Sequence, residues 1–588
     1  SNINYDLGLT YNQTITRLTA PDMLGHRVQQ ALNGFGGPNC NAPDLDATRL
    51  GTQNAAAAGK NGCLWLNPFM TSFTRNPALN LLNPQSGTNR NLAAPAGTTG
   101  WEVPQELQRW LYDDREIETV ASNLTLDLVF SGETGIELPG GALAWAVGAQ
   151  GRNLEQRETV PSKFYNGSVP CQWPGQDPIA AGQPGYTGCD NAGPFVFFDP
   201  EVPERSDQQQ YALFGELQIP VFDNFNLSAA VRNEEFSGGI GDTVYKVSGK
   251  WDVWGPISLR GSYGTNYLAP PIGLSAGEVT QGVANYALAG SQWLPSITVT
   301  DDSIGPATAT SWNAGFIWQS EGFASDHSFR FIVDYFDIET EKEFRQLATT
   351  NQILGAVYST TDAYNACNHP LAGRVRYQDS VATPGGVCNP ASPPTPFISA
   401  ANPGSLPAAL GSVTTVFGNG PGVITNGLDY QIDYSMPIGT GDFTIGATAT
   451  QVLELRDTKA ELDGFIVDPG QERLGELNLL GAARAAPEWS VNAFTSYRLD
   501  KHLFRVQADW RSAVTDDRTG KQYGENGEDP VYIDLIYMFD VLDNLRLSAT
   551  VKNIFDRDPA KYEIEYGYDA RLGSALGRTI EIGLKATY

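Results

Sequence analysis

The strongest constraint on this sequence is a series of 16 segments in which apolar and polar residues alternate. Most are roughly 10 to 14 residues long, whereas a strand in a globular protein averages about 5 to 6. A tilted strand that crosses a bilayer needs about 9 to 11 residues, so this length favours lipid-facing strands. The segments are 3–16, 121–132, 142–159, 209–221, 226–236, 243–254, 257–267, 310–320, 328–341, 425–437, 442–455, 488–499, 503–514, 531–539, 544–555 and 578–588.

The connections between these segments alternate between long and short. Short turns on one side and long loops on the other are typical of an outer-membrane barrel, whose long loops face outside. A β-sandwich gives no reason for this asymmetry. The sequence therefore predicts an all-β protein, a transmembrane antiparallel β-barrel with 16 strands in this chain. The five longest connections, expected to be extracellular loops, are 17–120, 160–208, 268–309, 342–424 and 456–487.

The polar positions of these segments carry full charges in mid-strand, which a packed core would not tolerate. A water-filled lumen accepts such charges while the alternate positions face lipid. In the segment 503–514 we expect Phe504, Val506 and Trp510 to face outward and Arg505, Asp509 and Arg511 to face inward.

Composition excludes other classes of protein. Lys and Arg together number 38 against 66 Asp and Glu, a formal net charge of −28. Nucleic acid needs a basic protein face, so no nucleic-acid partner is expected. No apolar run approaches the roughly 20 residues of a membrane-spanning helix.

The six cysteines occur as three pairs of near neighbours, each within a long connection. Six cysteines allow 15 connectivities, and we expect the local one, in an oxidising compartment. The cysteines lack CxxC spacing, so no zinc site is expected. The expected disulfides are Cys40–Cys63, Cys171–Cys189 and Cys367–Cys388.

No motif in the sequence predicts an enzyme, a cofactor or a metal site. Gly273–Gly277 fits G-x-S-x-G, but it follows two prolines within a loop, so it lacks the strand–turn–helix context of a nucleophile elbow. Loop carboxylates can bind Ca²⁺, but a hydrated surface is the simpler interpretation of Asp301, Asp302, Asp516 and Asp517.

Five tryptophans fall in the predicted outside loops. Exposed aromatic rings stack on sugars and flat organic molecules, although packing within the loops is an alternative for each of them. The candidate ligand-binding residues are Trp65, Trp101, Trp110, Trp173 and Trp293.

Several ordered motifs resemble one family. The run Ala549–Asp556, followed by Pro559 and an aromatic last residue, is similar to the C-terminal end of TonB-dependent receptors. Tyr263–Pro270 resembles the family's strand before an R-A-P segment, with Leu268 where Arg is usual, and Thr310–Gly315 resembles its next hairpin. Together the motifs extend the resemblance over nearly the whole chain.

The resemblance implies properties that the residues alone do not. In this family a barrel of 22 strands surrounds an N-terminal plug that binds the TonB complex, and the terminal aromatic, here Tyr588, is read by the barrel-assembly machinery. Counting back from that end, the 16 segments match strands 7–22. Residues 1–588 are then the C-terminal portion of such a barrel, with the plug and first strands cut off or on a separate N-terminal plug-bearing chain.

The function expected from the resemblance is a receptor in the bacterial outer membrane. It binds a bulky nutrient, either an oligosaccharide, another organic compound or an iron chelate, for TonB-energised uptake. Two alternatives remain: a passive, porin-like channel of 16 strands, and a secreted β-rich adhesin. Pairing of the first and last strands would favour the porin.

Overall fold

The computed structural model describes the chain with gaps in several long connections. The described residues are 3–41, 57–66, 104–166, 168, 194–196, 198, 203–274, 277, 279–286, 292–321, 326–358, 367–377, 410–478, 485–516, 531–562, 564 and 567–587.

One antiparallel sheet of 16 strands dominates the described residues. Each of its strands overlaps one of the 16 predicted segments, and strands that follow one another in the sheet order are antiparallel neighbours, which confirms the all-β class and the 16 strands of the predicted wall. Their bounds are β1 (Asn4–Met23), β2 (Tyr112–Leu138), β3 (Gly141–Thr159), β4 (Arg205–Phe222), β5 (Phe225–Phe236), β6 (Ile240–Trp254), β7 (Ile257–Leu268), β10 (Ala307–Glu321), β11 (Ser328–Glu341), β15 (Val423–Ile438), β16 (Gly441–Asp457), β19 (Trp489–Leu499), β20 (His502–Arg511), β21 (Val531–Leu542), β22 (Leu545–Lys552) and β23 (Thr579–Ala586).

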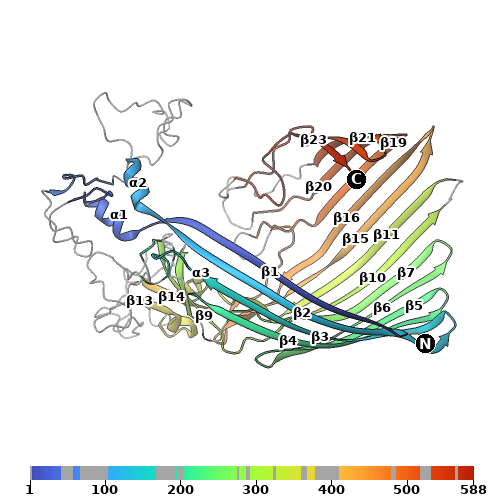
Figure 1. Ribbon diagram of the computed structural model, residues 1–588, viewed down its shortest axis with the longest axis horizontal. Helices are drawn as coiled ribbons and strands as arrows, with labels where there is room; N and C mark the ends of the chain where they lie inside the picture. The colour runs from blue at the N-terminus through green and yellow to red at the C-terminus, as the bar shows by residue number, and fades with distance from the viewer. Residues whose placement is uncertain are drawn as a thin grey trace.

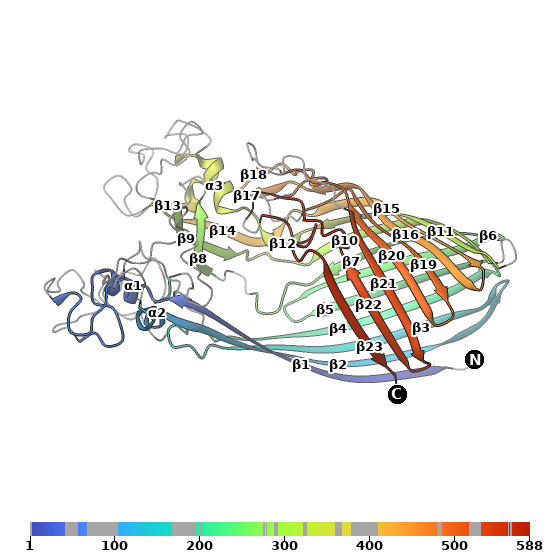
Figure 2. The same ribbon diagram turned by 90° about the horizontal axis from the view of Figure 1, so that it is seen from above.

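The two ends of the sheet differ, as the connection lengths predict. Tight turns join the strands at one end, where Gly255 and Gly439 have φ of +51° and +63°, a conformation that glycine adopts at little steric cost. The described parts of the long connections lie at the other end, and they include the helices α1 (Gly25–Leu32) and α2 (Gln105–Leu111) (Figures 1 and 2). Of the helices described, none has the length and apolar character to cross a membrane.

The first hairpin extends beyond its predicted limits. β1 continues past Thr16 to Met23, and β2 begins at Tyr112, so the connection between them is shorter than predicted. An ion pair of 2.5 Å between Arg17 Nε and Glu118 Oε2 links the added part. The added part includes Pro21, which lies opposite Asp114 in the register.

The sheet is open. β1 and β23 are its two outermost strands, and no pairing joins them within the described residues. Figure 1 shows them on opposite sides of the curved sheet. The closed 16-strand arrangement expected of a porin is therefore not the one observed, while the total of 22 strands stays a prediction.

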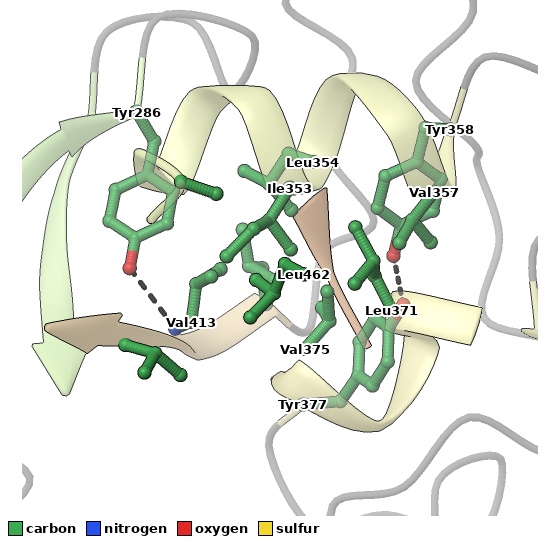
Figure 3. Close-up of a cluster of buried hydrophobic side chains, with 13 residues drawn as sticks. Tyr286, Ile353, Leu354, Val357, Tyr358, Leu371, Val375, Tyr377, Val413 and Leu462 are labelled. Carbon is green, nitrogen blue, oxygen red and sulfur yellow. Dashed lines mark hydrogen bonds between the residues drawn. The ribbon is translucent and has the colours of Figure 1, made fainter. Parts of the chain in front are cut away.

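Three of the long connections form a second small fold, which the sequence interpretation missed. We call it the outer sheet subdomain: a five-stranded sheet covered by one helix and one 3₁₀ helix. Figure 3 shows its buried core, in which Ile353, Leu354 and Val413 are fully enclosed. Its elements are β8 (Val279–Tyr286), β9 (Gln292–Thr300), β12 (Glu343–Gln346), α3 (Thr350–Val357), η5 (Pro370–Arg374), β13 (Val375–Tyr377) and β14 (Leu410–Gly420).

A hairpin from the third connection completes this core. The strands β17 (Ala460–Leu462) and β18 (Phe465–Asp468) bring the buried Leu462 against α3 and η5. The Arg374 guanidinium forms a two-point ion pair with the Asp463 carboxylate, with N–O distances of 2.5 and 2.7 Å. Segments that are distant in sequence therefore stabilise the outer sheet subdomain together.

Candidate functional site

A row of polar residues crosses the main sheet from β5 to β20. The strand register places one residue from each of nine neighbouring strands side by side, on the face opposite the exposed apolar side chains. We call it the polar row. Its members are Asn226, Lys250, Arg260, Gly315, Asp334, Asp429, Thr450, Ser490 and Arg511.

Positive and negative residues occupy separate parts of the polar row. Lys250 lies directly opposite Arg260, and Asp334 lies directly opposite Asp429. Like charges in such positions repel, so each needs a counterion or a hydrogen bond. Arg260 binds Asp334 with N–O distances of 2.7 and 2.5 Å, and the Thr450 hydroxyl donates to Asp429 at 2.6 Å.

Gly315 makes the Arg260–Asp334 ion pair possible. It lies between the two residues in the register, on the strand that separates them. A Cβ atom at this position would overlap the Asp334 carboxylate and approach Arg260 Cγ to 3.0 Å. Only glycine therefore lets the guanidinium reach the carboxylate across the intervening strand.

The substitution Gly315→Ala is expected to lower the free energy of unfolding by about 1–3 kcal/mol, because the added methyl displaces both partners of the ion pair. Thermal unfolding of the purified protein in detergent measures this change. Gly151→Ala is the matched control, since no atom lies within 4 Å of its added Cβ. Equal stability of the two variants would contradict the role given to Gly315.

Two recesses open on the face that carries the polar row, which we therefore call the inner face. One has a volume of about 490 Å³ and is lined by Asp429, Asn492, Asp509 and Arg511 among others. The other, of about 600 Å³, adds Lys246 and Lys250, and both share Arg260, Asp334 and Asp429. This polar wall suits a hydrated lumen rather than a packed core.

The alternation predicted for β20 is largely confirmed. Phe504 is 50% exposed and Val506 is 40% exposed, as expected of lipid-facing residues. Arg505 packs over the inner-face ring of Phe494 at 3.7 Å, and Asp509 accepts a hydrogen bond of 2.5 Å from Asn492. Trp510 lies on the same face as Phe504 and Val506, opposite Val491 and Val531 in the register, and is partly exposed.

Three of the five candidate tryptophans fall within the described residues, and they lie in different parts of the long connections. Trp110 in α2 packs against the core of Ala31, Leu107 and Leu111, with the Arg27 guanidinium 5.4 Å from its ring centre. Trp65 is 54% exposed and lies close to Gly34 and Gly59. Trp293 belongs to β9 in the outer sheet subdomain. The other two, Trp101 and Trp173, lie outside the described residues.

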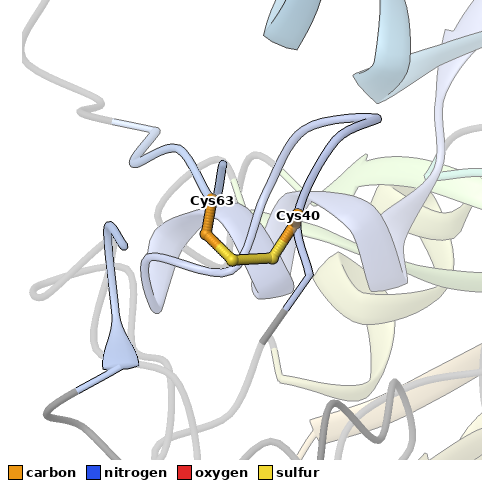
Figure 4. Close-up of a disulfide and its surroundings, with 2 residues drawn as sticks. All are labelled: Cys40 and Cys63. Atoms are coloured by element: carbon orange, nitrogen blue, oxygen red, sulfur yellow. A yellow bond between two sulfur atoms is a disulfide. The ribbon is translucent and has the colours of Figure 1, made fainter. Parts of the chain in front are cut away.

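One of the three expected disulfides, Cys40–Cys63, is present and joins the segment after α1 to a neighbouring stretch of the same connection (Figure 4). Cys367 is also disulfide-bonded. Its expected partner Cys388 and the pair Cys171–Cys189 lie outside the described residues, so those pairings stay predictions, as does the role of Tyr588, which lies outside them too.

Removing the Cys40–Cys63 bridge is expected to destabilise the helical lobe formed by α1 and α2. The bridge spans 23 residues, and closing a loop of that length contributes about 3 kcal/mol. Limited proteolysis of the double variant Cys40→Ser/Cys63→Ser should cleave between these positions much faster than in the wild type. Cleavage at the wild-type rate would contradict this prediction.

Tyr286 connects β8 to β14 through its buried hydroxyl group. The hydroxyl donates to Pro295 O at 2.6 Å and accepts from the Val413 N–H at 3.1 Å. Burial raises the pKa of Tyr286 to about 12, although the Val413 N–H bond acts in the opposite direction.

Alkaline pH is therefore expected to destabilise the outer sheet subdomain. The pKa of Tyr286 is higher in the folded than in the unfolded state, about 10, so its stabilisation is complete below pH 10 and is lost towards pH 12. The loss amounts to about 3 kcal/mol. Thermal midpoints at pH 9 and pH 11.5 should differ less in Tyr286→Phe than in the wild type; equal differences would contradict this.

Comparison with known proteins agrees with this architecture. The family model described as "TonB dependent receptor-like, beta-barrel" matches residues 4–554. The chain belongs to this family of outer-membrane receptors and transporters, which are not enzymes, and it is an integral protein of the bacterial outer membrane. A search of curated protein sequences gave no match.

Three of the solved structures similar to this chain are receptors of Pseudomonas aeruginosa. A mutant of the ferric enterobactin receptor PfeA has 13% identity and a TM-score of 0.47, over 84% of this chain and 64% of that one. The siderophore receptor PirA has 10% identity and a TM-score of 0.45, over 81% and 59%. The ferripyoverdine receptor has 14% identity and a TM-score of 0.43, over 81% and 49%. The chain thus spans less than two thirds of each receptor's length.

Proposed function

We propose that this chain is the greater part of the barrel wall of a receptor that takes up a nutrient with energy from the TonB complex. The outer sheet subdomain and the helical lobe would meet the ligand outside the cell, and the inner face would line its route. The polar row carries this proposal, because eight of its nine strands contribute a polar side chain at one level of a lipid-embedded sheet.

The polar row also suits a protein segment that fills the lumen. Lys246 and Lys250 favour acidic groups on that segment, and Asp429 and Asp509 favour basic ones. A plug domain on the same protein or on a separate chain would supply these groups. It would also close the lumen until the TonB complex pulls on it.

The unpaired edges of the main sheet favour the presence of further strands in the barrel. The backbone of β1 and of β23 has a sheet partner on only one side within the described residues. Each unsatisfied N–H or C=O group in lipid costs several kcal/mol. Exposed apolar side chains on β23, such as Ile582 at 82%, indicate that the outer face of this strand meets lipid. We propose that other strands of the barrel pair with both edges.

The nutrient would be an oligosaccharide, another bulky organic compound or an iron chelate. Iron chelates are favoured only by analogy with proteins named as receptors for ferric enterobactin and ferripyoverdine. The formal charge of −28 favours neutral or cationic ligands in general terms.

Uptake assays separate energised transport from passive diffusion. Cells that express the complete receptor, with any plug-bearing partner chain, would be given radiolabelled maltotriose or ferric enterobactin, with and without a functional TonB gene. Accumulation of a probe only with TonB would support the proposal. Accumulation that is proportional to concentration and independent of TonB would instead favour the porin-like channel.

A further inference from the structure

One face of the sheet in the outer sheet subdomain is apolar at one end and carries hydroxyl groups at the other. Under α3 the face is apolar: Ala284 and Leu294 lie opposite each other and pack against the buried core. Beyond the N-terminal end of α3, the same face carries hydroxyl groups. The register places Thr280, Thr298 and Thr415 in one row across β8, β9 and β14.

Some of these hydroxyls hold the row together. The Thr298 and Thr415 hydroxyls share a hydrogen bond of 2.9 Å, and Thr415, which is fully buried, also bonds to Ile297 O at 3.3 Å. These bonds hold the Thr298 side chain in position on this face of the sheet.

Other hydroxyls have no partner. Within the described part of the chain, no hydrogen bond is found for the side-chain hydroxyls of Thr280, Ser296 and Thr350, although Thr350 is 94% buried. Thr280 is exposed and Ser296 is half-buried, so water or a ligand can reach both hydroxyls and form the hydrogen bonds that they lack.

These groups surround one cavity of about 300 Å³, at the lower end of the range for small-molecule pockets. Gly282, which lies between Thr280 and Ala284 in β8, is part of its lining. All of its described lining residues are uncharged. They include Thr280, Gly282, Ser296, Thr298, Gln346 and Thr350.

We propose that this cavity binds a neutral, polyhydroxylated ring, such as one sugar unit of a larger ligand. Threonine and serine hydroxyls both donate and accept hydrogen bonds, which matches the hydroxyls of a sugar. A charged ligand would lose hydration here without gaining a counterion. The inference deepens the proposed uptake function and rests on it, because it names the ligand class met by the outer sheet subdomain.

Ligand binding to the purified protein tests this without any transport. Isothermal titration would use maltose as the probe, with glucuronate and glucosamine as charged comparisons. The double variant Thr280→Val/Ser296→Ala removes two hydroxyls that bond to nothing else in the described chain. Two lost hydrogen bonds of about 1 kcal/mol each raise the Kd of maltose tenfold or more.

The control is Thr414→Val, which makes the same change on the opposite face of β14 and should leave the Kd of maltose unchanged. Three results would overturn the proposal: no binding of maltose, equal affinity in the double variant, or tighter binding of either charged sugar. Because detergent-solubilised protein has no energy source, sugar binding without TonB-dependent uptake would instead contradict the proposed transport function and leave the cavity's role intact.

Discussion

The substitution Ala549→Arg is expected to destabilise the membrane-inserted sheet by about 2–4 kcal/mol, the cost of an arginine facing lipid near the bilayer midplane. Ala549 lies near the middle of β22, opposite Tyr537 and Ile582 on the outer face. Ile582 is 82% exposed, so the new guanidinium would have lipid rather than water around it.

The adjacent position supplies the control. Thr550 points to the inner face, where the register places it opposite Glu581. The guanidinium of Thr550→Arg therefore faces the lumen beside Glu581, which already binds Lys552 Nζ at 2.6 Å, and should change stability by less than about 1 kcal/mol. Urea unfolding from lipid vesicles measures both variants. Similar losses in the two, or a larger loss in Thr550→Arg, would show that the faces are assigned wrongly.

The second large effect is expected from Leu354→Ala in α3. Leu354 is fully buried in the core of the outer sheet subdomain, and truncating such a side chain to alanine costs about 2–5 kcal/mol. The loss should stay local, because this core is separate from the main sheet. Hydrogen exchange of β9 and β14 amides should accelerate roughly 30-fold or more.

Amides of β20 and β21 serve as the internal reference and should keep their protection in the same sample. Leu576→Ala is the matched variant, because Leu576 is 80% exposed and its truncation should change little. Faster exchange throughout the main sheet would mean that the outer sheet subdomain and the sheet unfold together.

The main sheet is the part of the fold that the sequence predicts well. A strand with one face in lipid and one in water alternates over its whole length, so even 11-residue segments such as β19 are visible in the sequence. The connection lengths then fix which end of the sheet carries the loops. The strand limits are less well predicted, since Pro21 and the charged residues near it do not suggest the extension of β1.

The outer sheet subdomain could not be predicted in the same way. β9 pairs in parallel with β14, so Val413 meets Ser296 from a different connection more than 100 residues away. Two of its five strands, β12 and β13, have only four and three residues, and the strands lie beside Gly- and Pro-rich stretches typical of loops. The apolar residues of these strands are buried beneath α3, so their pattern predicts a sheet only once the contact with this helix is known.

The polar row shows the same limit within the main sheet. Arg260 and Asp334 are 74 residues apart in the chain, and their sequence neighbours identify them only as polar residues of strands. Their contact depends on a register across three strands and on Gly315 between them. Among the candidate tryptophans, Trp110 packs against the core of the helical lobe. Composition alone does not distinguish such a packed ring from one that binds a ligand.

The orientation of the sheet decides whether the outer sheet subdomain can meet nutrients before they enter the lumen. Thiol labelling of intact cells tests this most directly, using a membrane-impermeant maleimide and single added cysteines, Glu461→Cys in β17 and Asp223→Cys in the β4–β5 turn. Both parent side chains are exposed. We expect position 461 to be labelled in intact cells and position 223 only after the outer membrane is opened. Labelling of position 223 in intact cells, with position 461 protected, would contradict the proposed receptor.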